Sequence, residues 1–147
     1  MKVMNLGLVR QARRIDPLWS VLDFLRRLWQ PAPRAAASGE PLSILVLDLH
    51  LIGDAVMLLP FLAALRRRHP SARITVVAGP WNRPVLAGEP ALDQLIEFSA
   101  PWVKGQGLRA SWTAARGLVR RLRTQRWDIG IDMRGDIRNI LVLYFAN

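Results

Sequence analysis

Hydrophobic residues form a short, nearly unbroken run over residues 44–49, and the pattern after it changes to a helical period. A run of this kind, rich in branched side chains, is typical of a strand buried on both faces of a parallel sheet. After Gly53-Asp54 a helix is predicted to residue 69, with Val56, Leu59 and Leu62 facing the core and a kink at Pro60. A second apolar strand follows at residues 74–78, so the pattern predicts a right-handed βαβ unit.

The rest of the chain continues this alternation. A third strand is predicted at residues 95–98, a helix at 108–126 with Trp112 facing inward, a fourth strand at 127–133 and a helix from residue 137. The predicted fold class is α/β, a Rossmann-like parallel sheet with helices on both faces. In such a sheet the first and fourth strands are neighbours and their helices leave on opposite faces. This arrangement is a topological switch point, with a ligand cleft beyond the carboxyl ends of the two strands.

Residues 1–40 differ from the rest and are interpreted as a basic amphipathic helical extension with a linker; residues 41–147 form the Rossmann-like domain. Asp16-Pro17 is a typical helix start, and Pro31 ends the apolar period that follows. Such a segment binds an anionic membrane surface, or it packs its apolar side against its own domain or a partner. The sequence leaves these alternatives open.

The net charge of +10, almost all of it from arginine, predicts an anionic partner: nucleic acid, anionic lipid or a phosphorylated substrate. The lack of cysteine excludes disulfides, thiolate zinc sites and a cysteine nucleophile, and two histidines do not make a histidine-rich metal site. No apolar run reaches the roughly 18 residues of a membrane span. Neither a signal peptide, a Walker motif nor a G-x-G-x-x-G motif is present.

Two acidic turns lie where the cleft is expected: Gly53-Asp54 after the first strand, and residues 132–136 after the fourth. Asp54 either caps its helix or acts as a general base, and the residues alone favour the cap. Asp132 and Asp136 likewise orient a substrate or cap the next helix, and Gly135 suits a tight turn. The arginines at 66–68 and 116–126 bind phosphates or form solvated helix faces.

Several segments together resemble glycosyltransferase family 9, which contains the lipopolysaccharide heptosyltransferases. They are ILVLDLHLIGD at residues 44–54, the following MLLP, LRRRHP at 65–70, and WDIGIDMRGD at 127–136. The resemblance covers the chain from about residue 42 onward. It implies the first half of a GT-B fold, in which this domain binds the acceptor and a second domain binds the nucleotide-sugar donor. It also implies inverting transfer without a metal ion or other cofactor, with Asp54 as general base. The substrate-binding residues implied are Gly53, Asp132, Arg134, Gly135 and Asp136.

The resemblance also implies the partners. The donor would be a nucleotide sugar such as ADP-heptose, and the acceptor a lipid-linked or phosphorylated glycan at the cytoplasmic face of a bacterial inner membrane. The chain departs from the family at Asp48, His50 and Leu51, where many members have a basic residue and small hydroxyl residues. We expect a chain that ends at residue 147 to be truncated, to lack the donor-binding domain and to be inactive alone.

A different hypothesis is a non-catalytic basic α/β module that binds an anionic membrane or another polyanion. Nucleic acid is the weaker partner of the two, because the arginines are not interleaved with aromatic residues in a known reader motif.

Overall fold

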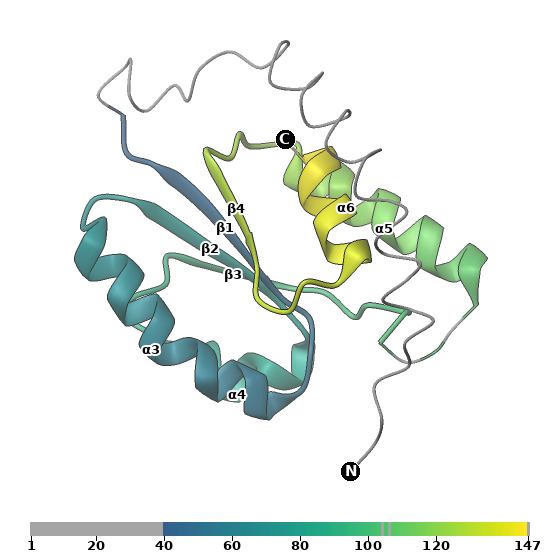
Figure 1. The fold of residues 1–147 in the computed structure, drawn as a ribbon, viewed down its shortest axis with the longest axis horizontal. Helices are drawn as coiled ribbons and strands as arrows, with labels where there is room; N and C mark the ends of the chain where they lie inside the picture. Colours follow the sequence, from purple (N-terminus) through teal and green to yellow (C-terminus); the bar gives the residue numbers. More distant parts are fainter. Residues whose placement is uncertain (1–39, 104, 106, 147) are drawn as a thin grey trace. The chain divides into compact units, whose positions relative to one another are not determined.

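The computed structural model describes residues 40–103, 105 and 107–146 (Figure 1). The predicted amphipathic helix of the extension and most of its linker lie outside these residues. The elements, in chain order, are β1 (Ser43–Asp48), α3 (Ile52–Arg68), β2 (Arg73–Ala78), the 3-10 helix η1 (Pro80–Asn82), α4 (Arg83–Leu86), β3 (Gln94–Glu97), α5 (Leu108–Leu122), β4 (Ile129–Asp132) and α6 (Ile137–Ala146).

The strands form one parallel sheet in the order β3-β2-β1-β4. Ile44 of β1 lies in register with Ile74 of β2 on one side and with Ile129 of β4 on the other. The predicted α/β, Rossmann-like fold is therefore confirmed, together with the neighbourhood of the first and fourth strands.

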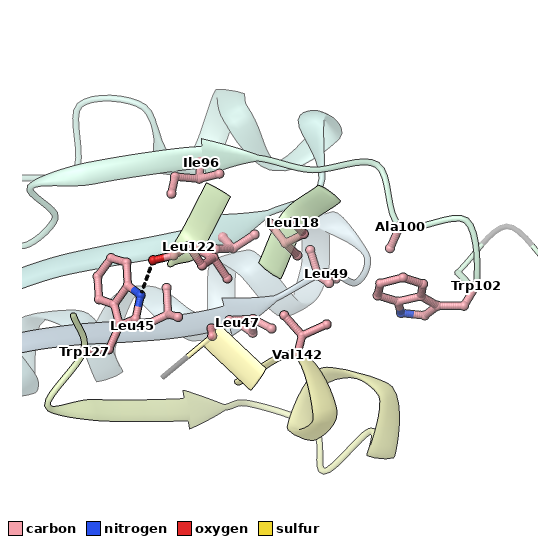
Figure 2. Close-up of a cluster of buried hydrophobic side chains, with 12 residues drawn as sticks. Leu45, Leu47, Leu49, Ile96, Ala100, Trp102, Leu118, Leu122, Trp127 and Val142 are labelled. Atoms are coloured by element: carbon pink, nitrogen blue, oxygen red, sulfur yellow. Dashed lines mark hydrogen bonds between the residues drawn. The ribbon is translucent and has the colours of Figure 1, made fainter. Parts of the chain in front are cut away.

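Helices cover both faces of the sheet, because alternate residues of the buried strands point to opposite sides. Ile44 and Val46 pack in a cluster with Leu58 and Leu62 of α3. On the other face Leu45 and Leu47 pack in a second cluster that contains α5 and α6 residues (Figure 2). In that cluster the Trp127 indole donates a hydrogen bond of 2.9 Å to the Leu122 carbonyl oxygen. The helices that follow β1 and β4 thus lie on opposite faces, as predicted.

Pro60 does not divide the helix into two segments, since α3 runs without a break from Ile52 to Arg68 with Pro60 inside it, and the kink stays a prediction. Proline removes one donor and leaves the carbonyl group of the residue four positions earlier, Val56, without its helical partner. The side chains of Val56 and Pro60 are both exposed, so solvent can reach this turn.

Two residues predicted to face the core, Val56 in α3 and Trp112 in α5, are exposed, although Leu62 of the predicted α3 face is buried. In α3 the buried residues include Leu58 and Leu62, whereas Val56 is 50% exposed and lies about 160° from Leu58 around the helix. In α5 the inner face carries Leu118 and Leu122, and Trp112, about 120° from Leu118, is 66% exposed. Both helices contain apolar residues on more than one side, and periodicity alone does not select the side that meets the sheet.

Candidate functional site

The loop between β1 and α3 is held in place by the turn that follows β2. The His50 carbonyl oxygen accepts hydrogen bonds from the Trp81 indole and from the Asn82 side-chain amide, the latter at 3.2 Å. Trp81 can take this position only because residue 79 is glycine: a Cβ on Gly79 would lie 2.3 Å from the indole ring. Packing of this second turn therefore fixes the backbone immediately before the Gly53-Asp54 pair.

Asp54 lies in the first turn of α3, with its side chain 43% exposed. Its Oδ2 accepts a hydrogen bond of 3.2 Å from the backbone N–H of Leu51, the N-cap residue. The same oxygen lies 3.5 Å from Nη1 of Arg134, which belongs to the turn after β4. Gly53 is exposed, and no heavy atom lies within 4 Å of where its Cβ would be. The capping contact thus exists, and the carboxylate still faces open space.

The turn after β4 engages its carboxylates more fully. Asp132 accepts 2.9 Å hydrogen bonds from the backbone N–H of Asp136 and from the side-chain amide of the buried Asn139. Asp136 accepts hydrogen bonds from the backbone N–H and the guanidinium of Arg138, and the guanidinium contact lowers the pKa of Asp136. Gly135 has a φ of 70°, which confirms the predicted tight turn. These contacts shape the turn and the start of α6.

Asp48, at the end of β1, is a feature of this site that sequence reasoning missed. Its side chain is 1% exposed, and neither carboxyl oxygen accepts a hydrogen bond of regular geometry in the described part of the chain, although the nearby backbone N–H of His50 favours the charged form. Burial raises the pKa of Asp48 to about 6, and the nearby Asp54 carboxylate adds to the shift. The available signal was a single acid at the end of an otherwise apolar run. From the sequence alone, Asp48 is identified only as a residue that differs from the family pattern.

The structure therefore brings Asp54 and Arg134 into contact across the carboxyl edge of the sheet, with Asp48 buried beside them. His50 belongs to the same edge, and burial together with the Arg134 charge lowers its pKa. A pocket of about 350 Å³ beside α4 and β3 contains none of the predicted site residues. Within the described residues, no group of three or more histidine or acidic side chains is placed to bind a metal ion.

The arginines at 66–68 include one whose role is structural. The Arg66 guanidinium pairs with Asp93 and donates to the carbonyl oxygens of Pro70 and Ala72, at 3.1 and 2.6 Å. It thus joins the end of α3 to the segments that flank β2 and β3. The predicted phosphate-binding alternative is wrong for Arg66, since its donors are engaged inside the fold.

No family model matches the chain. One curated relative, lipopolysaccharide heptosyltransferase 2 of Salmonella typhimurium, is 30% identical over 106 residues, which are 72% of this chain and 29% of that protein. The solved structure of the Escherichia coli ADP-heptose lipopolysaccharide heptosyltransferase II matches with a TM-score of 0.59 and 28% identity, over 71% of this chain and 28% of that chain. A family 9 glycosyltransferase of Veillonella parvula matches with a TM-score of 0.63 and 24% identity, over 74% and 30%.

These comparisons confirm the predicted resemblance to glycosyltransferase family 9, and the fold is that of a Rossmann-like unit of such enzymes. The chain's relatives are glycosyltransferases, and the chain spans less than a third of their length.

Proposed function

We propose that this chain is the acceptor-binding part of a glycosyltransferase that moves a heptose or similar sugar onto a lipopolysaccharide-type or other lipid-linked glycan. The observation that carries the proposal is the exposed Asp54 carboxylate at the carboxyl edge of the sheet, paired with Arg134 at the switch point between β1 and β4. Its support outside the site is the similarity to heptosyltransferases in sequence and in fold.

Asp54 acts as the general base in this proposal. Its carboxylate takes the proton of an acceptor hydroxyl, and the freed oxygen attacks the anomeric carbon of the donor sugar from the side opposite the nucleotide. The bond between the sugar and the nucleoside diphosphate breaks, the diphosphate leaves with the electron pair, and the anomeric configuration inverts. No metal ion takes part. The donor, a nucleotide sugar such as ADP-heptose, is bound mainly by a second domain in enzymes of this fold.

The remaining site residues bind and orient the acceptor. Arg134 is half exposed and offers its guanidinium to anionic groups of a phosphorylated glycan. The open space at Gly53 lets substrate approach Asp54 closely, while Asp132, Gly135 and Asp136 hold the turn that carries Arg134. A lipid-linked acceptor places the protein at the cytoplasmic face of the inner membrane. No helix in the described ranges is both long and apolar enough to cross a bilayer.

The test is Asp54→Asn in the full-length product of the native gene, assayed for ADP release from ADP-heptose in the presence of a lipopolysaccharide-type acceptor. Loss of a general base is expected to lower kcat by roughly 10²–10⁴-fold. The folded state should persist, because the Asp54 side chain is exposed and only one backbone N–H donates to it.

Asp128→Asn is the matched control, since the Asp128 carboxylate also accepts one backbone hydrogen bond, 2.8 Å from Ser43 N, but at the opposite edge of the sheet. It should turn over like the wild type. Wild-type turnover in Asp54→Asn would overturn the base assignment. If the wild-type product itself shows no turnover, the non-catalytic module that binds a polyanion becomes the better description.

A further inference from the structure

The outer surface of α5 carries a line of positive charge that forms no ion pair within the described residues. Arg109, Arg116, Arg120 and Arg123 are exposed, and they lie together with Trp112 within roughly 80° of the helix circumference, over a length of about 21 Å. We call these five residues the α5 stripe. The opposite side of the helix carries Leu118 and Leu122, which are buried against the sheet.

The arginines of the stripe differ from other arginines of the domain. Arg66, Arg83, Arg134 and Arg138 each pair with a carboxylate, whereas no ion pair among the described residues involves an arginine of α5. The helix contains no acidic residue. Arg109 even lies in the first turn, where the helix dipole disfavours a positive charge. Stability of the domain accounts for Arg120, which complements the dipole in the last turn, and for Arg123, which bonds to α6, but not for Arg109 and Arg116.

The exposed Trp112 favours a lipid bilayer as the anionic partner of the stripe. Trp112 leaves 66% of its surface in solvent, at the border of the arginines. Indole rings favour the boundary between the headgroups and acyl chains of a bilayer, and arginines beside them bind anionic headgroups. Near the last turn, the Arg123 side chain donates to the Phe145 carbonyl oxygen of α6, and Phe145 is itself 46% exposed. Both ends of the stripe thus combine arginine with an exposed aromatic ring.

The position of α5 fits a membrane-bound substrate. In a parallel α/β sheet each connecting helix begins at the carboxyl edge and returns to the amino edge, so the first turns of α5 belong to the same edge as Asp54 and Arg134. A bilayer that contacts the first turns of the stripe would therefore lie on the side of the domain that carries this edge.

We propose that the α5 stripe docks the protein on the surface of an anionic lipid bilayer. The choice of a bilayer over other polyanions rests on the proposed function, in which the acceptor is lipid-linked. Arginines supply the attraction to anionic headgroups, and Trp112 enters the interfacial layer. The inner face of α5 stays packed on the sheet, so docking requires no rearrangement of the fold.

The experiment is co-sedimentation of the full 147-residue chain with vesicles of phosphatidylglycerol and phosphatidylcholine, compared with vesicles of phosphatidylcholine alone. The variant Arg109→Gln/Arg116→Gln/Arg120→Gln is expected to lower partitioning into the anionic vesicles on the order of 100-fold, since each arginine at the surface contributes roughly five-fold. Glutamine is a good helix former and the changed side chains are exposed, so the circular dichroism spectrum should not change.

The matched control is Arg67→Gln/Arg68→Gln/Arg73→Gln, which removes three exposed arginines that lie outside the α5 stripe, at the end of α3 and the start of β2. Because net charge acts weakly beyond a Debye length, this variant should lose no more than a few-fold in partitioning. Equal losses in the two variants, or no loss in the α5 variant, would overturn the proposal.

Trp112→Ala gives an independent reading, with an expected several-fold loss of vesicle binding and no change in binding to duplex DNA at the same salt concentration. If the triple α5 variant lost DNA binding while vesicle binding persisted, the stripe would belong to a nucleic-acid interface instead. None of these measurements uses donor, acceptor or turnover, so their outcome is separate from that of the Asp54 test.

Discussion

The two acidic turns at the carboxyl edge of the sheet look alike in sequence but differ in how their carboxylates are engaged. After β4, Asp132 accepts two 2.9 Å hydrogen bonds and Asp136 is held by Arg138. In the first turn of α3, Asp54 makes one 3.2 Å hydrogen bond and one long ion pair, and at the end of β1 Asp48 accepts no hydrogen bond of regular geometry within the described residues. The carboxylate that is both accessible and weakly engaged is therefore Asp54, beside the β1 end.

This difference distinguishes carboxylates that stabilise the fold from carboxylates that are left for function at the same edge of the sheet. A carboxylate with all its hydrogen bonds satisfied lowers the free energy of the fold, and its loss is felt as instability. A buried carboxyl group without partners raises that free energy instead. The β4 turn thus builds the scaffold, whereas the β1 end carries groups that the fold does not need for its stability.

The largest effect on stability is expected at Asp132. Asp132→Ala removes both hydrogen bonds and leaves the amide of the buried Asn139 without its acceptor. The free energy of unfolding should fall by about 2–4 kcal/mol, as measured by urea denaturation of the chain.

Urea denaturation of Asp54→Ala allows the two acidic turns to be compared. Only a weak capping contact is lost there, so the decrease should be about 1 kcal/mol or less. Equal destabilisation by the two substitutions would remove the distinction between a structural turn and a functional turn.

Substitution of Asp48 is expected to have the next largest effect, but it should increase the free energy of unfolding instead of decreasing it. Its pKa is raised to about 6 by burial and then by Asp54, so the folded chain holds a proton that the unfolded chain has released between about pH 4 and pH 6. Stability from this group is therefore present below about pH 4 and is lost as the pH rises through about 6. Asp48→Asn should stabilise the chain by about 2–3 kcal/mol near pH 7.5 and have little effect near pH 4.

Thermal or urea denaturation of Asp48→Asn and the wild type across this pH range measures the difference. Comparing the two proteins removes the contributions of Asp93 and Asp136, whose lowered pKa values give the opposite pH dependence in both. Asp128→Asn serves as a control with a partly buried, hydrogen-bonded carboxylate. A stability gain that is independent of pH would show that Asp48 is not protonated in the folded chain.

The sequence predicts most of the fold because the strands are short apolar runs whose alternate residues are buried on both sides, as Ile44 and Leu45 are. It also places Asp54 and Asp132 at one edge, since Asp132 ends β4 and Asp54 lies in the first helical turn after the neighbouring parallel strand β1. Helix faces are harder to predict, because Met57 is as hydrophobic as Leu58 and yet is 74% exposed. Which side is buried depends on how the helix sits on the sheet.

The sequence also does not predict which of these side chains are hydrogen-bonded, because this too depends on how the elements pack. Asp48 becomes buried only when the rest of the chain packs around the end of β1, and its carboxyl oxygens then accept no hydrogen bond of regular geometry within the described residues. Arg66 becomes a structural residue only when α3 brings it to Asp93, 27 positions away. Both outcomes depend on contacts between segments far apart in the chain, which the pattern of polar and apolar residues does not encode.

The smallest effect is expected at Arg134, which links the two turns. Its ion pair with Asp54 is long, at 3.5 Å, and both side chains are about half exposed, so Arg134→Gln should change the free energy of unfolding by less than about 1 kcal/mol.

The electrostatic effect of Arg134→Gln on nearby titratable groups should be clearer than its effect on stability. Burial and then the Arg134 charge lower the pKa of His50, so removing that charge should raise the pKa of His50 in an NMR titration. Arg83→Gln, at an ion pair with Glu97 of β3, a strand that β2 separates from β1, should leave it unchanged. An unaltered His50 titration in Arg134→Gln would mean that the guanidinium does not face the β1 end in solution, and the contact that joins the two turns would be lost with it.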